Sequence, residues 1–513
     1  NLHPDERFIT MVATWIQWPS SLGEYFNTAI NPLSPYNNPD YPTFIYGTFP
    51  LYVAKLYGEL TGHTDYGNFH LASRSVSAIF DLLTTFFLFL IAKRLFNEKI
   101  GLLASLLYAL SVLPIQLSHF GTFDLTASAL CVMAFYFALR ANDNGRWWEF
   151  SLAGIMVGLA LASKLSALPI AAVLALPLIE QLRINGPDAF WNRKGRTGIP
   201  VILGVLLAGM LAFWAFRVTQ PFSFTGPGLL DISLNPHWTG DVEYWRHVQS
   251  GDYDGNPSTQ WANRAPLIFI LKNFVLWGVG PVFGVVSLIA LVLASVRVLT
   301  ARRWPPTWQL FIIAWPAFHL VYYGISFIKT MRYTVPAYPF MALLTAALLY
   351  ELWGRIAERW PNYRWAGAIP VLLVVLPTAF WAFAFTSTYT HTQTRVAASE
   401  WIYANIPEGT HVLNEHWDDP IPLNLPGMPG SGAYPGDQIA MYDDDNPEKL
   451  AKLMQQLKDN DYIFVTSNRL YGSIPRIPER WPMGTKYYEM LIDGELGFDL
   501  IHTETNYPSL FGI

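Results

Sequence analysis

Long apolar stretches recur along most of this chain, and they constrain its fold more than any other feature. A helix that crosses a bilayer needs about 20 mostly apolar residues. Only 14% of the residues are charged, whereas soluble domains carry roughly 25%. The sequence therefore predicts an α-helical polytopic membrane protein with about 10–11 transmembrane helices. The apolar stretches are residues 74–93, 100–115, 122–139, 150–166, 168–182, 198–217, 267–296, 308–327, 333–353 and 365–389.

Lysine and arginine cluster after alternate stretches, which predicts how the chain is oriented. Cytoplasmic loops of membrane proteins are enriched in these two residues. The junction at residues 116–121 has neither, so we assign it to the opposite, outer side. We expect a plasma-membrane protein in which residues 1–71, the loop 219–265 and everything after 390 are extracytoplasmic. The basic clusters begin near Lys93, Arg140, Arg183, Arg297 and Arg355, and the third includes Arg193, Lys194 and Arg196.

Three regions follow from this pattern: an outer segment at 1–71 with interfacial helices near 41–60, a transmembrane domain at 72–390, and an extracytoplasmic domain at 391–513. In the last region, helix and strand patterns alternate, which predicts a small α/β domain. Asn446 is placed to cap one of its helices. We also expect the natural chain to continue before Asn1 and after Ile513. Helices are predicted at 396–406, 446–458 and 486–492, and strands at 410–414, 462–465 and 498–502.

The first polar feature is a pair of adjacent carboxylates, Asp5 and Glu6, followed by Arg7. Adjacent carboxylates repel each other, so one of them holds its proton more tightly or binds a cation. This arrangement is typical of a general base or of a metal or cation ligand. The alternative is a solvated helix start, where acidic residues favour the helix dipole.

More ionisable residues lie at the predicted outer ends of the spans. Ionisable groups at this depth are costly and usually functional or paired, and Lys and Arg together favour a phosphate group. Two plainer readings remain open: an acid can cap its helix, and a cation can extend its side chain toward the interface. The residues concerned are His119, Asp124, Lys164, Lys329 and Arg332.

Other features favour simpler interpretations. Arg74 and Asp81 lie about two turns apart on one predicted helix, and we interpret them as a structural pair. Cys131 is the only cysteine and is expected to pack in a core. No basic run indicates nucleic-acid binding. A divalent metal site is a further hypothesis without diagnostic spacing, and its candidate ligands are His3, Asp5, Glu6, His119 and Asp124.

Several of these motifs together resemble the GT-C glycosyltransferases, and among them glycosyltransferase family 39, which contains protein O-mannosyltransferases and the aminoarabinose lipid A transferase. The resemblance covers roughly residues 2–353. It rests on the acidic pair Asp5-Glu6, on Asp124 after His119-Phe120, on Lys164 after Gly158-Leu159-Ala160, and on the basic and proline-rich segment from Lys329 to Pro339.

The resemblance implies an inverting enzyme that takes a sugar from a polyprenyl-phosphate carrier at the outer membrane face. Asp5 would be the base that deprotonates the acceptor hydroxyl, with Glu6 tuning it and Asp124 assisting on the acceptor side. The C-terminal domain departs from the β-rich domain of protein mannosyltransferases, so the acceptor stays open between protein, lipid and glycan. The residues expected to bind substrate or carrier phosphate are Arg7, His119, Lys164, Lys329, Arg332 and Tyr333.

Two other functions remain as alternatives. One is a lipid-carrier transporter that uses the same outer cavity without chemistry, although transporters typically show internal repeats and charges near the membrane midplane. The other is a non-catalytic membrane subunit that recruits a partner through its outer segments. The adjacent Asp5 and Glu6 favour the transferase, since neither alternative requires a base.

Overall fold

The chain forms two compact units in a computed structural model that describes residues 3–39, 43–186, 198–253, 255–256 and 258–513. Arg193, Lys194 and Arg196 of the predicted inner loop therefore lie outside the described residues. The first unit comprises Asn1–Arg246, Leu267–Ile325 and Thr330–Ala382. The second comprises His247–Pro266, Ser326–Lys329 and Phe383–Ile513.

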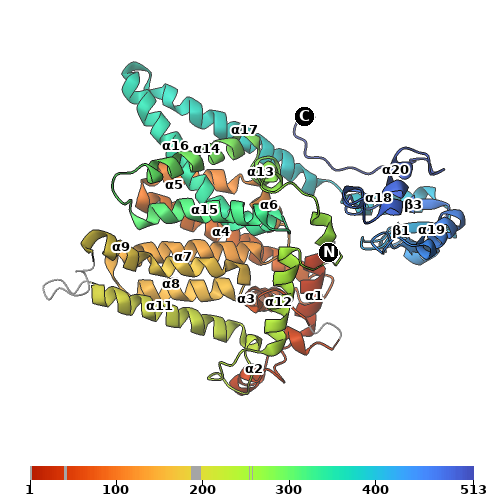
Figure 1. The fold of residues 1–513 in the computed structure, drawn as a ribbon, viewed down its shortest axis with the longest axis horizontal. Helices are drawn as coiled ribbons and strands as arrows, with labels where there is room; N and C mark the ends of the chain where they lie inside the picture. The colour runs from red at the N-terminus through yellow and green to blue at the C-terminus, as the bar shows by residue number, and fades with distance from the viewer. Residues whose placement is uncertain (1–2, 40–42, 187–197, 254, 257) are drawn as a thin grey trace. The chain divides into compact units, whose positions relative to one another are not determined.

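Helices build the whole of the first unit (Figure 1). Its outer segment contains α1 (Pro4–Trp15), α2 (Leu22–Phe26), η1 (Pro35–Asn37) and α3 (Thr48–Thr61). The bundle that follows contains α4 (Phe69–Leu95), α5 (Glu98–Ala109), α6 (Val112–Ser118), α7 (Asp124–Asn144), α8 (Trp147–Leu161), η2 (Leu165–Ala175), α9 (Leu176–Asn185), α11 (Gly198–Thr219), η3 (Pro221–Ser223), α12 (Pro236–Ser250), α13 (Ile268–Asn273), η5 (Phe274–Gly278), α14 (Pro281–Leu299), α15 (Thr307–Ile325), η6 (Met331–Ala337), α16 (Tyr338–Arg359), η7 (Pro361–Gly367) and α17 (Ala368–Thr386).

The number of spanning helices is lower than the sequence predicts. Among the described residues, seven helices are long and apolar enough to cross a membrane, or eight if α5 and α6, which are bent by 62°, form one broken span. Two predicted spans do not qualify: α8 has only 15 residues, and α15 has 19 residues but is not apolar enough. The stretch 267–296 contributes one span, α14, and is divided. Its first part ends in η5, a turn of π-helix, and α14 begins at Pro281 after Gly280, whose φ is +92°. Proline favours the first turn of a helix, so Gly280-Pro281 in the sequence already indicates that a new helix begins there.

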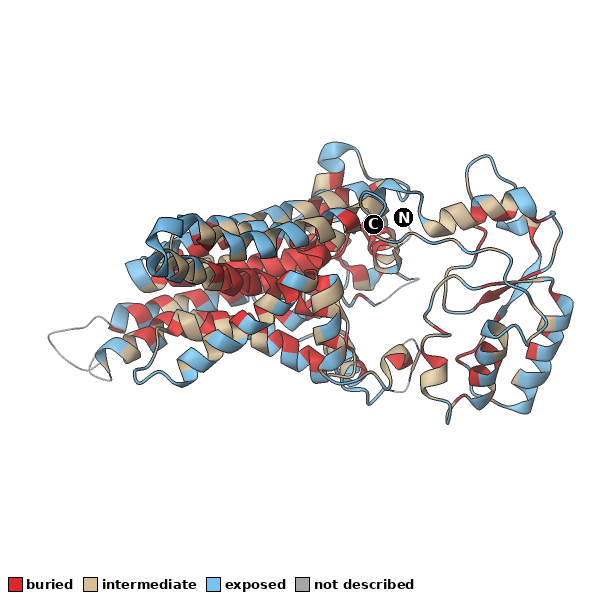
Figure 2. Cartoon of the chain, turned by 90° about the horizontal axis from the view of Figure 1, so that it is seen from above, coloured by how far each residue is buried: buried red, intermediate tan, exposed pale blue. Residues whose placement is uncertain are grey.

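Two of the spans form the centre of the bundle. The most apolar window of α7 is 78% buried, and that of the span Met331–Arg359 is 67% buried, against 22% for α11 and α14. Buried residues accordingly line the inside of the bundle (Figure 2). Its outer helices expose many apolar residues. Phe135 of α7 stacks on Phe311 of α15, with ring centroids 4.5 Å apart. Both central spans begin at the candidate site described below.

The outer segment packs onto the start of the bundle through its own apolar cluster. Ile9 and Val12 of α1 lie against Leu51 of α3 and Val76 of α4, and all four are almost fully buried. Burial of each such side chain stabilises the fold by roughly 1.5–3 kcal/mol. The contacts hold the first turn of α1, with Asp5 and Glu6, next to α4.

The second unit contains a small parallel sheet in the order β2–β1–β3. Val412 and Leu413 of the central strand point to opposite faces, so each face carries its own apolar cluster. One cluster includes Ile402 of α18 and the other includes Leu453 of α19. The elements are η4 (Ser258–Trp261), η8 (Ser387–Thr390), α18 (Thr394–Asn405), β1 (Val412–Glu415), η9 (Ser431–Ala433), β2 (Gly436–Ile439), α19 (Pro447–Asp459), β3 (Tyr462–Phe464), η10 (Ile474–Arg476) and α20 (Pro482–Ile492).

Most predictions for this unit are confirmed. Asn446 caps α19, because its side chain accepts a hydrogen bond from the Lys449 N–H at 2.8 Å. Two predictions fail. The strand expected at 498–502 is irregular in the structure, where none of the sheet's strands pairs with it. The edge strand β2 was not expected, because three of its four residues are exposed and polar or glycine, and its apolar pattern is therefore weak.

Candidate active site

A chain of alternating charges joins four predicted site residues in the first unit. The guanidinium of Arg332 donates a hydrogen bond to the Asp5 carboxylate. Its Nη1 also lies 3.9 Å from Oδ2 of Asp124. The ammonium of Lys164 donates to the other oxygen of Asp124. The structure thus brings together residues that are up to 327 positions apart in the sequence, in the order Asp5–Arg332–Asp124–Lys164.

Each of these residues stands at the end of a helical element. Asp5 lies in the first turn of α1 and Asp124 is the first residue of α7. Lys164 follows the end of α8, and Arg332 lies in η6, which leads into α16. Charged side chains are least costly at such ends, because the neighbouring backbone groups are polar and solvent is near.

A close backbone approach holds Lys164 in place. Gly47 donates its N–H to the Ser163 carbonyl at 3.1 Å, and the Phe49 N–H donates to the Ala162 carbonyl at 3.2 Å. A Cβ on Gly47 would lie 1.9 Å from the Ala162 oxygen, so only glycine fits. The loop before α3 is thereby fastened to the end of α8, directly beside Lys164.

Exposure differs along the charge chain. The side chain of Asp124 is 5% exposed, whereas those of Asp5, Lys164 and Arg332 are 23%, 24% and 30% exposed. Asp124 is therefore a buried node that holds two cations, and the other three residues can reach a ligand. Two carboxylates and two cations balance, so a bound anion would attract the cations away from their present partners.

Two tyrosines complete the surroundings of the charge chain. The Tyr333 ring lies 4.4 Å from the Lys164 ammonium, in a cation–π arrangement. Tyr46 hydrogen-bonds to Asp5, and burial together with that carboxylate raises the pKa of Tyr46 well above its usual value. The Tyr46 phenol thus stays protonated at neutral pH and donates to Asp5. Sequence reasoning missed Tyr46, since no spacing links positions 5 and 46 before the outer segment folds.

Glu6 occupies a different environment from Asp5. Arg74 donates to both of its carboxylate oxygens, from Nε and Nη2, at 2.7 Å each. The Gly121 N–H adds a third bond at 2.7 Å, and Glu6 is fully buried. A Cβ on Gly121 would lie 2.0 Å from the Ser73 hydroxyl, so this approach also requires glycine. Glu6 therefore ties α1 to α4 and to the α6–α7 junction.

The predicted pair of Arg74 and Asp81 is not found. Arg74 pairs with Glu6 instead. Asp81 accepts hydrogen bonds from the Tyr108 and Ser118 hydroxyls at 2.6 and 3.2 Å. Helical spacing had placed both residues on one helix, and it carried no information about partners on other segments.

Three other predicted residues lie outside the charge chain. Arg7 is half-buried in α1. His119 is exposed at the end of α6, with Nδ1 2.8 Å from the Ile115 carbonyl oxygen. Lys329 belongs to the second unit, where it is buried and its ammonium donates to the Phe327 carbonyl at 3.3 Å.

The candidate metal ligands take separate partners. Asp5 is paired with Arg332, Glu6 with Arg74, and His119 with a backbone carbonyl. Burial lowers the pKa of His3, whose ring packs against Phe120 with centroids 4.7 Å apart. In the part of the chain that the structure describes, no group of three or more His, Cys, Asp or Glu side chains is arranged to hold a metal ion.

Comparison with known proteins relates this geometry to a family. Residues 49–215 match the family described as dolichyl-phosphate-mannose-protein mannosyltransferase. The oligosaccharyltransferase of Archaeoglobus fulgidus, solved in complex with Zn and sulfate, matches at a TM-score of 0.50 and 17% identity over 81% of this chain. The chain covers 60% of that protein's length. ArnT of Cupriavidus metallidurans bound to undecaprenyl phosphate matches at a TM-score of 0.43 and 14% identity, over 90% of this chain and 88% of ArnT. No curated protein sequence matches the chain.

These matches agree with a GT-C glycosyltransferase fold: residues 49–215 match one such family, and the fold resembles that of the oligosaccharyltransferase. The resemblance seen in the sequence is thus confirmed, as is a multi-pass membrane protein with a small α/β domain. The family match spans α3 to most of α11 and includes Asp124 and Lys164. It begins after Asp5 and ends before Arg332, so the other half of the charge chain comes from segments outside the match.

Proposed function

We propose that this protein is an inverting glycosyltransferase that moves a sugar from a polyprenyl-phosphate carrier to a hydroxyl group of a protein, lipid or glycan. The reaction would take place at the outer face of the plasma membrane. The observation that carries the proposal is the charge chain Asp5–Arg332–Asp124–Lys164, in which a partly exposed carboxylate lies beside two cations. Transfer from a phosphate carrier needs both a base and positive charge.

On the acceptor side, Asp5 acts as the base. Its carboxylate takes the proton of the acceptor hydroxyl while the oxygen bonds to the anomeric carbon of the sugar. Tyr46 donates a hydrogen bond to Asp5 and orients it. A positioned base of this kind contributes roughly 10²–10⁴-fold to a rate.

On the donor side, Lys164 and Arg332 bind the carrier phosphate. The bond between the anomeric carbon and the phosphate oxygen breaks as the new bond forms on the opposite face, which inverts the configuration. The phosphate leaves as an anion and is stabilised by the two cations, so it needs no general acid. Arg332 now bonds to Asp5. When the phosphate binds, Arg332 turns toward it and frees the carboxylate to accept a proton.

The donor class is supported by the family description, which names dolichyl-phosphate mannose. Dolichol is a polyprenol derivative, so this description supports a polyprenyl-phosphate carrier and makes mannose the first sugar to test. Lys329 lies three residues before Arg332 in the sequence. It is therefore a third candidate cation for the carrier phosphate. Membrane lipids surround the spans, and the lipid carrier reaches the site from them.

The test is transfer of radiolabelled sugar from polyprenyl-phosphate mannose in membranes that contain the wild type or Asp5→Asn. We expect label in a protein, lipid or glycan product with the wild type and about a 10³-fold lower rate with the variant. Asp65→Asn is the matched control, because Asp65 is an exposed acid of the same outer segment.

Each outcome decides between the functions considered. Equal rates for wild type and Asp5→Asn would remove Asp5 from the chemistry. Binding of the carrier by a wild type that transfers no sugar, from mannose or from other hexose carriers, would indicate the transporter or the non-catalytic subunit instead. Chemical identification of the labelled product then gives the acceptor class.

A further inference from the structure

The sheet of the second unit has a topological switch point between β1 and β3. The chain passes from β1 to its neighbour β2 on one side, and then crosses through α19 to β3 on the other side. Because β1 and β3 are parallel, the loops that follow them both begin at this edge of the sheet. In open parallel sheets, ligands bind in the crevice outside the carboxyl ends of the strands at such a point.

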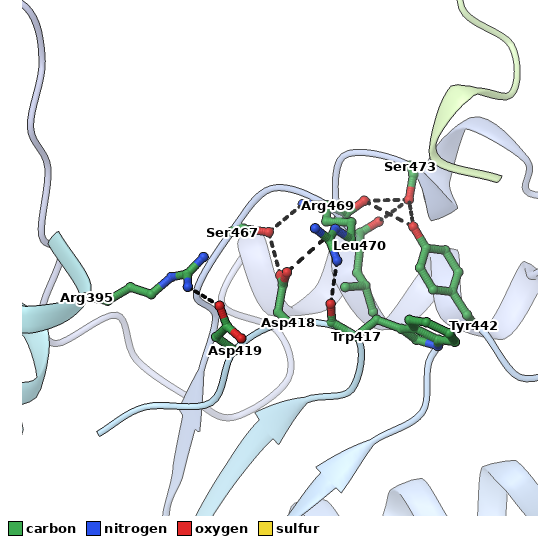
Figure 3. A network of polar contacts seen from close by, with 9 residues as sticks. All are labelled: Arg395, Trp417, Asp418, Asp419, Tyr442, Ser467, Arg469, Leu470 and Ser473. Carbon is green, nitrogen blue, oxygen red and sulfur yellow. Dashed lines mark hydrogen bonds and ion pairs between the residues drawn. The ribbon is translucent and has the colours of Figure 1, made fainter. Parts of the chain in front are cut away.

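A polar network fills this point (Figure 3). In the loop after β1, Asp418 accepts a hydrogen bond from the Ser467 hydroxyl, which follows β3. Asp418 also lies 3.7 Å from Nε of Arg469. Arg469 in turn donates from Nη1 to the Trp417 carbonyl at 2.5 Å. The loops after β1 and β3 are thus bonded to each other at three points.

The same network extends to the helix before the sheet. Arg395, in the first turn of α18, is paired with Asp419. On the far side, the Ser473 hydroxyl bonds to the Arg469 carbonyl at 2.5 Å and to the Tyr442 hydroxyl at 2.7 Å. These contacts hold Arg469 from both its backbone and its side chain (Figure 3). Preorganisation of this kind is what a binding site requires.

Trp417, in the loop after β1, has an unusual backbone conformation and an exposed side chain. Its φ is +78°, which is a genuine outlier for a bulky residue. Its side chain is 41% exposed, and the ring of His416, also exposed, lies 5.4 Å away. Strained backbone conformations of this kind cluster at active sites and ligand-binding sites.

The charges of the network indicate the chemistry of its ligand. Asp418 and Asp419 are each paired with an arginine, so the cluster is neutral as a whole. A simple anion or cation would find no uncompensated charge there. Paired carboxylates and guanidiniums still offer acceptors and donors at fixed positions to a ligand that carries hydroxyl groups. The exposed Trp417 ring, in the same loop, offers an apolar face.

We propose that this switch point is a saccharide-binding site. A pyranose has an apolar C–H face that fits an exposed aromatic ring, and a rim of hydroxyl groups that fits paired acids and arginines. Trp417 is the platform, and Arg469 and the pair of Arg395 and Asp419 bind the rim. Asp418, whose side chain is 4% exposed, positions Arg469. The inference is independent of the proposed function, because it concerns binding by the second unit and needs no transfer at Asp5.

The test uses the purified full chain in a detergent without a sugar headgroup, titrated by calorimetry with neutral disaccharides: mannobiose, cellobiose, lactose and maltose. We expect at least one disaccharide to bind, and to slow hydrogen exchange in the peptides that contain residues 416–419 and 467–469. Trp417→Ala should weaken binding at least about tenfold, as truncation of a central Trp usually does. Tyr507→Ala is the matched control, since Tyr507 is an exposed aromatic residue elsewhere in this unit.

Asp418→Asn provides a second variant in case loss of the tryptophan disturbs the loop. It should also weaken binding at least about tenfold, while exchange in β1 stays at the wild-type rate. No binding by any of the four disaccharides would overturn the proposal. Full binding by Trp417→Ala would do the same, as would displacement of the disaccharide by millimolar inorganic phosphate or by a Ser/Thr-containing peptide. Binding that persists in Asp5→Asn separates this site from the transfer reaction.

Discussion

Asp5 and Glu6 are neighbours in the sequence, yet they lie in two different environments. Glu6 is fully buried and accepts three hydrogen bonds, two from Arg74 and one from the Gly121 N–H. The Asp5 side chain is 23% exposed and is held by Arg332, which is itself shared with Asp124. On a helix, adjacent residues point about 100° apart, so Glu6 faces the protein interior while Asp5 stays partly exposed.

The difference separates two uses of a carboxylate. A buried carboxylate whose donors are all in place stabilises a unique arrangement of segments, and it is costly to disturb. A partly exposed carboxylate with an exchangeable partner can bind substrate and accept a proton. The predictions below test whether the Glu6 region serves stability and the Asp5 region serves chemistry.

The largest effect should come from breaking the Glu6 region. Arg74→Leu leaves a buried charge without its main partner, and we expect unfolding to become easier by about 3–5 kcal/mol. Thermal unfolding in detergent measures this, and hydrogen exchange should increase in α1. Activity per folded molecule should change little.

A double variant shows whether charge is the cause. Glu6→Gln with Arg74→Leu removes both partners, so it should lose clearly less stability than the two single variants added together. An additive loss would contradict the pairing. A loss of activity per folded molecule in Arg74→Leu would contradict the division between the two regions.

In the Asp5 region, a substitution that keeps the charge should lower the transfer rate and leave the stability almost unchanged. Lys164→Arg retains a cation beside Asp124, so the stability should stay within about 0.5 kcal/mol. A planar guanidinium replaces a point charge above the Tyr333 ring, however, and the phosphate contact is displaced. We expect transfer to fall by about 100-fold, or about 2.7 kcal/mol.

The matched experiment is Arg74→Lys, the reverse exchange in the other region. It keeps the charge but loses the bidentate geometry, so it should lower stability with little effect on transfer. Rates of transfer and unfolding temperatures for both variants, measured side by side, test the comparison directly. If Lys164→Arg and Arg74→Lys changed the transfer rate and the unfolding temperature in the same way, the division between stability and chemistry would be wrong.

The smallest of these effects concerns Glu415. Like Glu6 it is buried, but unlike Glu6 it has no arginine partner within the described ranges of the chain. It is buried at the end of β1 and receives one hydrogen bond, from Tyr488 at 2.5 Å, while its Oε2 has no partner among the described residues. Burial raises the pKa of Glu415 to about 7, with a smaller contribution from Asp418. The folded state thus holds the proton more tightly than the unfolded chain does.

The sign of the pH dependence follows from that difference. The contribution of Glu415 to stability is fully present below about pH 4.5 and is lost as the pH rises toward 7. Between pH 5 and pH 8 we expect the second unit to lose about 2 kcal/mol. Glu415→Gln should remove this loss, as measured by hydrogen exchange of β1 peptides at the two pH values. An unchanged pH dependence in the variant would exclude Glu415 as its source.

The sequence predicts the parts of this fold that depend on local composition. The positions of α4, α7 and α11, the cap at Asn446 and the core strands β1 and β3 all follow from hydrophobic period or from a capping residue. The edge strand β2 was not predicted, because its exposed residues show no alternation of apolar and polar side chains. The span count is too high, because α8 is too short and α15 is not apolar enough to qualify, although both lie in predicted apolar stretches.

The sequence by itself determined a polytopic helical membrane protein and the types of ionisable residue that form the candidate site. It also marked Asp5, Asp124, Lys164 and Arg332, because ionisable residues at span ends are costly to keep. Only the tertiary structure decided which of them pair. It placed Tyr46 on Asp5, and it turned Glu6 inward to Arg74 rather than toward the substrate side. The physical reason is that a side chain's partners come from segments far away in the sequence, and no local period records them.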